Sequence, residues 1–154
     1  MDVILIAAVT QDGFISRHAH ETVRWSKDLR LFKEQTLGWP VIMGTHTFRC
    51  LTKELTGRDV CIVHRGDDPK KILSKYNTEK CFVIGGGKTN ARFSPHLTHL
   101  YLTPHPIVFG SGIRLFSEPT EEMKLKLEKT VTVKKSEGIF QYQYRINRDI
   151  GHTG

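Results

Sequence analysis

Hydrophobic and polar positions along the chain divide it into short apolar runs and longer amphipathic stretches. The amphipathic stretches predict helices at residues 26–37, 45–51, 69–76 and 88–93, with Ser26 as the N-cap of the first and Pro69 at the start of the third. The apolar runs, rich in β-branched and aliphatic residues and bounded by turn residues, predict strands at 3–9, 40–43, 59–63, 80–84, 99–103, 129–133 and 140–146. Strands that alternate with helices indicate a mostly parallel sheet, and the short "KKSEG" link between the last two strands indicates an antiparallel C-terminal edge.

Length and composition indicate one globular domain. The 154 residues are 38% hydrophobic and 25% charged, which predicts a single domain over residues 1–146 and a polar, disordered tail over 147–154. No apolar run approaches the roughly 18 to 20 residues of a membrane span, and the first apolar run reads as a strand, not as a signal peptide. The odd number of cysteines, three, argues against a disulfide framework. Cys61 and Cys81 lie in apolar runs, so we expect buried thiols in a reducing cytoplasm.

The net charge of +7 leaves open which kind of anion the protein binds. The 23 Lys and Arg residues are spread along the chain, and the densest pairs, Lys70–Lys71 and Lys134–Lys135, are not interleaved with aromatic residues. This distribution disfavours a nucleic-acid partner. A small anionic ligand would use the same basic surface equally well.

Three strand ends carry residues that can bind phosphate. "CFVIGGGKTNARF" reads as a strand, the glycines Gly85, Gly86 and Gly87, and a helix start, where backbone N–H groups can approach a phosphate closely. It lacks the GxGxxG fingerprint, and a tight strand-to-helix turn explains the glycines as well. The strand at 40–43 runs into "GTHT", and the strand at 59–63 runs into His64 and Arg65. Because ligands bind at the carboxyl ends of parallel strands, the three ends together favour one shared ligand.

Asp28 is an acid on what should be an apolar helix face. An acid in the first turn of a helix contributes about 0.3–1 kcal/mol through the helix dipole, which is the simpler explanation. However, Leu29, Phe32 and Trp25 lie on or near the same face. Burial among them should raise the pKa of the carboxyl unless a cationic ligand group meets it.

The segments "DLRLFKEQTLGWPVIMGTHTF", "LTGRDV", "VIGGGKTNARF" and "LYLT" together resemble the dihydrofolate reductase family, in the family's order over about 100 residues. The resemblance implies a three-layer α/β fold with helices on both faces of the sheet. It also implies NADPH-dependent reduction of 7,8-dihydrofolate to tetrahydrofolate by a monomer or homodimer. Asp28 would bind the pterin 2-amino and ring N–H groups and support protonation at N5. Thr103 would share this network.

The resemblance also assigns roles to other residues. Arg58 matches the arginine that clamps the glutamate α-carboxylate, and His64 and Arg65 match the site of the adenosine 2′-phosphate, which favours NADPH. Residues that would line the pterin and benzoyl pocket are Ala8, Leu29, Phe32, Leu51, Leu55 and Ile84. Residues that would hold the cofactor are Ile15, Gly44, Thr45, His46, Thr47, Gly85, Gly86, Gly87, Lys88 and Thr89.

Several departures keep other functions open. Thr45 stands where the family has a basic residue, and Asn90 stands where it has an aromatic one. "TPHPIVFGSGIRLFSE" is similar to the homologous pyrimidine reductases of riboflavin synthesis, so a ribosylaminopyrimidine-phosphate reductase is the main alternative. A non-catalytic nucleotide-binding module is another. We expect no metal site, because no nearby cysteine or acid pair completes one with His18 and His20.

Overall fold

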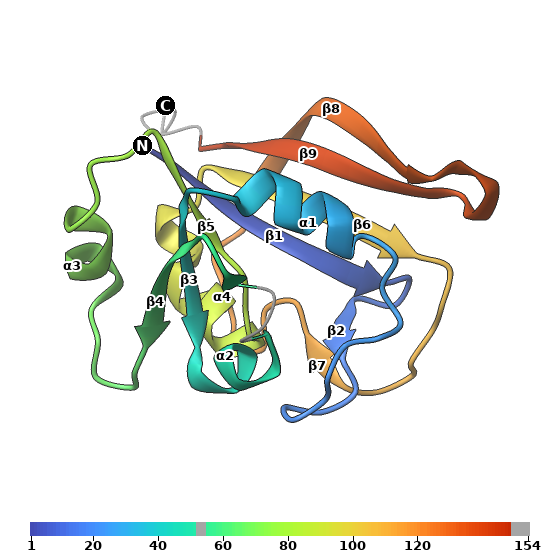
Figure 1. The fold of residues 1–154 in the computed structure, drawn as a ribbon, viewed down its shortest axis with the longest axis horizontal. Helices are drawn as coiled ribbons and strands as arrows, with labels where there is room; N and C mark the ends of the chain where they lie inside the picture. Colours follow the sequence, from blue (N-terminus) through green and yellow to red (C-terminus); the bar gives the residue numbers. More distant parts are fainter. Residues whose placement is uncertain (52–54, 149–154) are drawn as a thin grey trace.

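A seven-stranded sheet in the order β4-β3-β5-β1-β6-β9-β8 forms the centre of the computed structural model, which describes residues 1–51 and 55–148 (Figure 1). The first five strands of this order are parallel, and β9 and β8 add an antiparallel edge. This confirms the predicted fold class. The strands are β1 Asp2–Thr10, β3 Pro40–Gly44, β4 Asp59–Val63, β5 Lys80–Val83, β6 His99–His105, β8 Lys124–Lys134 and β9 Ile139–Asn147.

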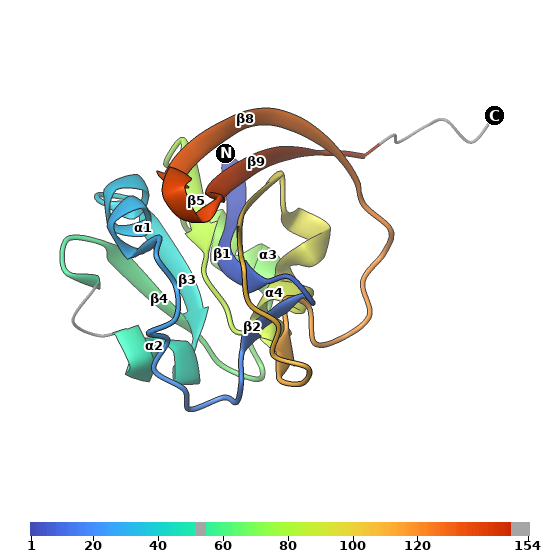
Figure 2. The same ribbon diagram turned by 90° about the vertical axis from the view of Figure 1, so that its right-hand side faces the viewer.

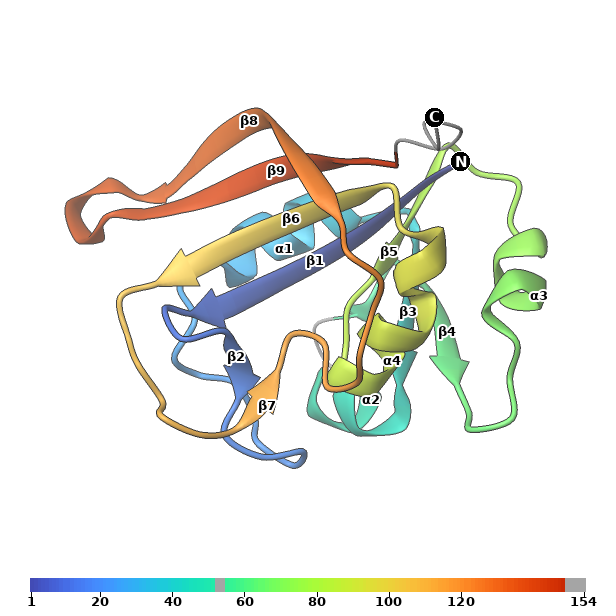
Figure 3. The ribbon, with the colours of Figure 1, turned by 180° about the vertical axis from the view of Figure 1, so that it is seen from behind.

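Helices cover both faces of the sheet. The helices α1 Leu29–Thr36 and α2 Thr45–Leu51 lie on one face, and α3 Pro69–Ser74 and α4 Gly87–Phe93 lie on the other (Figures 2 and 3). Successive residues of β1 therefore enter two different cores, because side chains alternate across a strand. Ile4 and Ile6 pack in the core that Phe32 and Leu51 of α1 and α2 approach. On the other face, Leu5 packs with residues that include Phe93 of α4 and Ile72 of α3.

Burial on both faces explains why the strand cores read as nearly continuous apolar runs. Leu5, at the centre of β1, lies opposite Val83 of β5 on one side and Leu100 of β6 on the other, and it is completely buried. The same pattern holds for Val41 to Met43 in β3. A strand that is covered on both faces has no solvent-exposed side for polar residues, as is usual in parallel sheets.

The structure corrects several predicted boundaries. The first helix begins at Leu29, with Asp28 as its N-cap residue, so the prediction that Ser26 caps it was wrong. The third helix ends at Ser74, and Asp68 caps it by accepting the Lys70 N–H at 3.0 Å. The strand predicted at 129–133 begins at Lys124, because this exposed edge strand has few buried positions to mark it.

Four short elements were not predicted. The strands β2 Phe14–Ser16 and β7 Ile113–Arg114 pair with each other as a separate two-stranded sheet, and Ser94–His96 and Lys135–Glu137 form 3-10 turns. At the other end of the chain, β9 continues through Asn147, and Arg148 donates to the carbonyl oxygens of Ser94 and Leu97. The rest of the predicted tail, 149–154, lies outside the described residues. Among the helices that the structure describes, none is long and apolar enough to cross a membrane.

Candidate active site

A cavity of about 550 Å³ opens on the face of the sheet that carries α1 and α2. Its walls come from β1, the segment that runs from β2 to α1, both helices, and the turn that follows β5. This volume is ordinary for a small-molecule site. The lining residues are Ile6, Ala7, Ala8, Ile15, Ser16, Ala19, Glu21, Thr22, Val23, Arg24, Trp25, Ser26, Asp28, Leu29, Phe32, Thr47, Cys50, Leu51, Ile84, Gly85, Gly86 and Asn90.

Asp28 lies on the cavity wall and is only 7% exposed. Burial raises the pKa of its carboxyl, and smaller opposing effects come from His105 and from the Ser26 and Thr103 hydroxyls. Its side chain makes no capping hydrogen bond to α1, although it occupies the N-cap position. A carboxyl that is buried beside a cavity and does not cap its helix is available to a ligand.

Thr103 approaches this carboxyl from β6. It is completely buried, and its hydroxyl makes no hydrogen bond of standard geometry within the described part of the chain. The structure therefore brings Asp28 and Thr103 together, as the resemblance implied, from positions 75 residues apart in the sequence.

The apolar wall of the cavity contains most of the residues expected there. Ala8, Leu29, Phe32, Leu51 and Ile84 all line it, and Leu29 is 42% exposed at its margin. Leu55 is different: it is buried in the core cluster against which Phe32, Leu51 and Ile84 pack, and it does not line the cavity. It supports the apolar wall from behind.

Arg58 does not line the cavity, and contacts with α1 fix its guanidinium. Nε donates to Thr36 Oγ1 at 3.1 Å, Nη1 donates to the Thr56 carbonyl, and Nη2 donates to the Lys33 carbonyl. The side chain is thus held at the C-terminal half of α1 with each nitrogen already donating once. Its role as a carboxylate clamp stays a prediction.

Four of the residues expected to hold the cofactor, Ile15, Thr47, Gly85 and Gly86, line the cavity. The others expected near the glycine turn and α2 do not; these are Gly44, Thr45, His46, Gly87, Lys88 and Thr89.

Close packing surrounds two of these glycines, most tightly Gly87. The Gly44 N–H donates to the Gly85 carbonyl at 2.9 Å, and a Cβ at Gly44 would lie 3.0 Å from Thr89 Oγ1. A Cβ at Gly87 would lie 2.6 Å from the Arg114 carbonyl oxygen. Close packing thus accounts for part of the glycine pattern.

His64 and Arg65 lie exposed at the end of β4, away from the cavity walls. The His64 N–H donates to Asp67 Oδ2 at 2.8 Å, and Arg92 of α4 donates to the carbonyl oxygens of His64 and Asp67. Arg92 therefore fixes the turn that presents Arg65. Sequence reasoning missed Arg92, since its contacts with the turn are 25 and 28 residues apart and belong to no motif.

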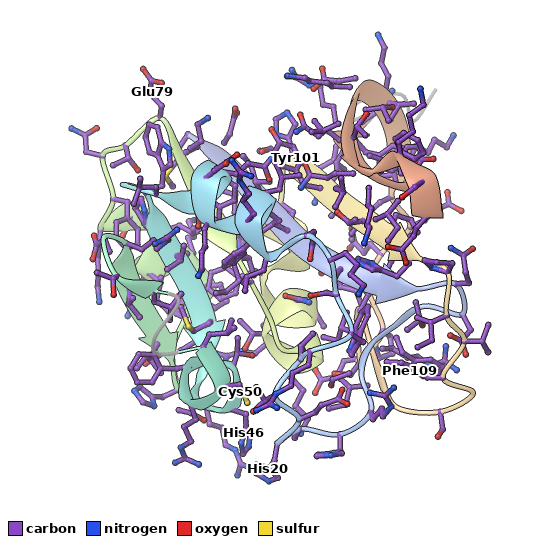
Figure 4. The ribbon with its side chains drawn as sticks, turned by 45° about the vertical axis from the view of Figure 1, so that its right-hand side comes forward. His20, His46, Cys50, Glu79, Tyr101 and Phe109 are labelled. Carbon is purple, nitrogen blue, oxygen red and sulfur yellow. The ribbon has the colours of Figure 1, made fainter. Side chains whose placement is uncertain are left out.

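Cys50 and His20 had no signal as site residues in the sequence. Cys50 lines the cavity, and the side chain of His20 meets His46 edge to face, with ring centroids 4.7 Å apart. Asn90, which stands where the family has an aromatic residue, lines the cavity too. Figure 4 shows His20 near His46 and Cys50, and the latter two belong to α2. Among the described residues, no group of three His, Cys, Asp or Glu side chains could hold a metal ion.

Asp12 fixes the position of the segment 109–114, which belongs to the stretch that resembles the pyrimidine reductases. Its carboxylate accepts hydrogen bonds from the Thr10 hydroxyl at 2.6 Å, from the Phe109 N–H at 3.2 Å and from the Gly110 N–H at 2.7 Å. The Thr10 hydroxyl and, to a lesser extent, the two N–H groups lower the pKa of Asp12. The segment 109–114 is thereby held against β2, beside the cavity.

Two solved structures share this fold. A dihydrofolate reductase from Enterococcus faecalis has a TM-score of 0.72 at 18% identity, and the match covers 96% of this chain and 97% of that one. A riboflavin biosynthesis protein from Shewanella has a TM-score of 0.65 at 16% identity, with 96% and 100% covered. At these identities the likeness shows the fold alone.

The chain belongs to the dihydrofolate reductase family, whose members are oxidoreductases. The family model described as dihydrofolate reductase matches residues 2–110. Dihydrofolate reductase type 3 of Salmonella typhimurium is 32% identical over 117 residues, which are 67% of this chain and 71% of the relative. Dihydrofolate reductase type 9 of Escherichia coli is 26% identical over 166 aligned positions, 89% of each chain.

Proposed function

We propose that this protein catalyses the NADPH-dependent reduction of 7,8-dihydrofolate to tetrahydrofolate. The observation that carries the proposal is the buried Asp28 carboxyl on the cavity wall, with its raised pKa. A pterin ring offers adjacent N–H donors, and a carboxylate with two acceptor oxygens pairs with them. Burial makes such a pairing strong, because no water competes for the carboxylate.

Asp28 also supports the protonation step in this proposal. Reduction adds a hydride to the pterin carbon and a proton to the adjacent N5. The raised pKa keeps the Asp28 carboxyl protonated to a higher pH than usual, and a positioned acid typically contributes about 10² to 10⁴ in rate. The hydroxyl of Thr103 beside it can hold the carboxyl in one orientation.

The turn after β5 fits a flat cofactor ring. When bound, NADPH supplies the hydride. A Cβ at Gly85 or at Gly86 would have only Thr47 Oγ1 within 4 Å, at 3.5 and 3.8 Å, so the missing side chains leave space in the cavity wall. Ile15 lines the cavity as well and can cover the ring.

The phosphate end of the cofactor would extend toward β4. His64 and Arg65 are the basic pair on the turn that Arg92 holds, and they would meet the 2′-phosphate. The Enterococcus faecalis relative is described as complexed with NADP(H), which supports the same cofactor here.

A riboflavin-pathway ribosylaminopyrimidine-phosphate reductase is the second candidate. The segment 110–116 favours it, and so does the structural likeness to the Shewanella protein. Both enzymes would draw on the same cofactor, so only the substrate separates them.

The test is NADPH oxidation by the purified protein, with dihydrofolate and with the ribosylaminopyrimidine phosphate in parallel. We expect turnover with dihydrofolate only, and loss of most of it in Asp28→Asn. Turnover with the pyrimidine alone would establish the second candidate. NADPH binding without turnover of either substrate would identify a non-catalytic nucleotide-binding module.

A further inference from the structure

His105 is a buried histidine that the proposed reaction does not use. It is the last residue of β6, two positions after Thr103, and it is 2% exposed. Its Nδ1 lies 2.8 Å from the Thr103 carbonyl oxygen, and its Nε2 lies 2.9 Å from the backbone nitrogen of Lys27. Both ring nitrogens are therefore engaged by backbone groups.

These two partners specify the protonation state of the ring. A carbonyl oxygen can only accept, so Nδ1 must carry a hydrogen, and a backbone N–H can only donate, so Nε2 must be bare. The contacts thus require a neutral imidazole with its hydrogen on Nδ1. A protonated ring would present a hydrogen to the Lys27 N–H and would lose this bond.

Lys27 directly precedes Asp28, in a segment with little regular structure of its own. The helix begins only at Leu29, and the Asp28 side chain makes no capping hydrogen bond that would fix it to the helix. Trp25, in the same segment, packs edge to face on His105 with ring centroids 5.2 Å apart. His105 therefore contacts this segment twice, by a hydrogen bond and by an aromatic contact.

We propose that His105 is a positioning residue that holds Asp28 in place through the Lys27 N–H. The proposal rests on the proposed function, because Asp28 is the acid of that reaction. A shift of 1 Å in a catalytic group can lower the rate by about 10²-fold. A bond to the adjacent backbone nitrogen is well placed to prevent such a shift.

The charges that face His105 come from two elements. Asp28 and Lys27 belong to the segment before α1, and Glu137 lies in the turn between β8 and β9. A positive His105 would lower the pKa of Asp28, against the effect of burial. The neutral ring that the hydrogen bonds require removes this effect, so only hydrogen bonds, including those of the Ser26 and Thr103 hydroxyls, oppose the effect of burial on the pKa of Asp28.

Two substitutions at His105 separate the hydrogen bond from the bulk of the ring. His105→Phe keeps an aromatic ring against Trp25 and removes the acceptor, whereas His105→Gln places Oε1 near the position of Nε2 and restores an acceptor. His99→Phe is the matched control, since His99 is also a buried histidine of β6 but pairs with Glu128 at 3.5 Å, at the far end of the strand.

We expect His105→Phe to lower kcat for dihydrofolate by on the order of 10- to 10²-fold, with little change in the KM for NADPH. It should also change the pH profile of kcat. His105→Gln should recover most of kcat, and His99→Phe should leave it unaltered. An equal loss in His99→Phe, or no recovery in His105→Gln, would show that His105 acts on the fold alone and would overturn the proposal.

If a variant fails to fold, or if the parent does not reduce dihydrofolate, two measurements on the substrate-free parent still test the role of His105. Nitrogen-15 NMR of the parent should show a neutral His105 with its hydrogen on Nδ1, and the Lys27 amide should exchange slowly with solvent. The other tautomer, or rapid exchange at Lys27, would overturn the positioning role. A parent without turnover on dihydrofolate overturns the proposed function, but leaves these two results to decide on His105.

Discussion

Asp28 combines a low exposure with a carboxyl that no ion pair among the described residues neutralises. Burial raises the pKa of its carboxyl, so the native state holds this proton more tightly than the unfolded chain does. The contribution of Asp28 to stability is thus fully present below its unfolded pKa and is lost as the pH rises through the raised folded pKa. Above the raised pKa the ionised carboxylate destabilises the fold, and such a cost is common at functional sites.

Asp28→Asn should therefore lower activity and raise stability at the same pH. We expect turnover with dihydrofolate to fall by on the order of 10²-fold at pH 7, with partial recovery in acid, where solvent can protonate the substrate. The thermal midpoint should rise at pH 7, and this gain should disappear at acidic pH. Rate profiles and thermal denaturation across pH measure the loss of activity and the gain in stability. Turnover close to that of the parent would mean that Asp28 acts only on the helix dipole.

Arg58 is the residue that we expect to distinguish folate from smaller substrates, as the carboxylate clamp that the resemblance implies. Arg58→Leu should weaken the binding of methotrexate about 10- to 150-fold, because a charge-assisted hydrogen bond contributes roughly 1.5–3 kcal/mol. A diaminopteridine without the glutamate should bind nearly as before. Titration of both ligands, with Arg58→Lys as the variant that keeps the charge, checks this. Equal weakening of both ligands would mean that Arg58 acts through its bonds to Thr36 and to the Lys33 and Thr56 carbonyls.

Some residues of the site can be predicted from a local sequence pattern, and others cannot. Asp28 could be predicted because an acid stands out beside Leu29 and Phe32 within a few positions of sequence. His105 could not, because its bond to Lys27 spans 78 residues and a histidine after a strand has many explanations. Leu55 fits the apolar pattern equally well in a core or in a cavity wall, and only the packing shows that it lies in the core.

Arg65 lies in the turn after β4, and Arg92 fixes this turn through hydrogen bonds to its carbonyl oxygens. Arg65→Ala should raise the KM for NADPH about fivefold, which corresponds to roughly 1 kcal/mol for an exposed charge pair. The KM for NADH should hardly change, because NADH has no 2′-phosphate. Steady-state kinetics with both cofactors check this, and Lys126→Ala on the exposed edge strand β8 is a control for the lost charge. An equal rise of the KM for NADPH and for NADH would mean that Arg65 stabilises the fold and does not bind the 2′-phosphate.

The pair β2 and β7 depends on one glycine. Gly112 has a φ of 143°, and a Cβ there would lie 2.3 Å from the Ser16 carbonyl oxygen. Gly112→Ala should therefore separate β2 from β7 and destabilise the protein by roughly 1–3 kcal/mol, the usual cost of such strain. NADPH binding should weaken too, since Ile15 of β2 lines the cavity.

Thermal denaturation and cofactor titration measure the effect of Gly112→Ala. Gly66→Ala is the control for thermal denaturation, because a Cβ at Gly66 meets no atom of the described residues within 4 Å and its φ is not in the left-handed region. Equal stability of the two variants, with NADPH binding by Gly112→Ala as in the parent, would show that the pairing of β2 with β7 contributes nothing to the site.

Long apolar strands were predictable, whereas the short strands were not. The pattern located β1, β3, β4 and β5 because burial on both faces leaves little room for polar residues. β2 and β7 have three and two residues, too few for any periodicity, and they are held by Asp12 and by the fit of Gly112. The start of α1 was misplaced because Ser26 fits the rule for caps, while the fold places Asp28 there.

The excess of positive charge over the whole chain should assist an anionic cofactor and substrate. With a net charge of +7, long-range attraction is strongest at low ionic strength. The screening length falls from about 30 Å at 0.01 M salt to about 8 Å at 0.15 M. We expect the KM for NADPH to rise over this range, with a much smaller change for the binding of an uncharged diaminopyrimidine. Equal salt effects on both would point to a change in the fold.

The position of β1 at the centre of the sheet governs the order in which a growing chain can assemble it. β1 is synthesised first, yet its two neighbours in the sheet begin only at Lys80 and His99. At about 5–20 residues per second, the first of these neighbours leaves the ribosome roughly 4 to 16 seconds later. Throughout this interval a strand that is apolar on both faces has no partner, which invites pairing with other chains. Thr103 lies in the second of these neighbours, so the reaction centre is completed only after that period of exposure has ended.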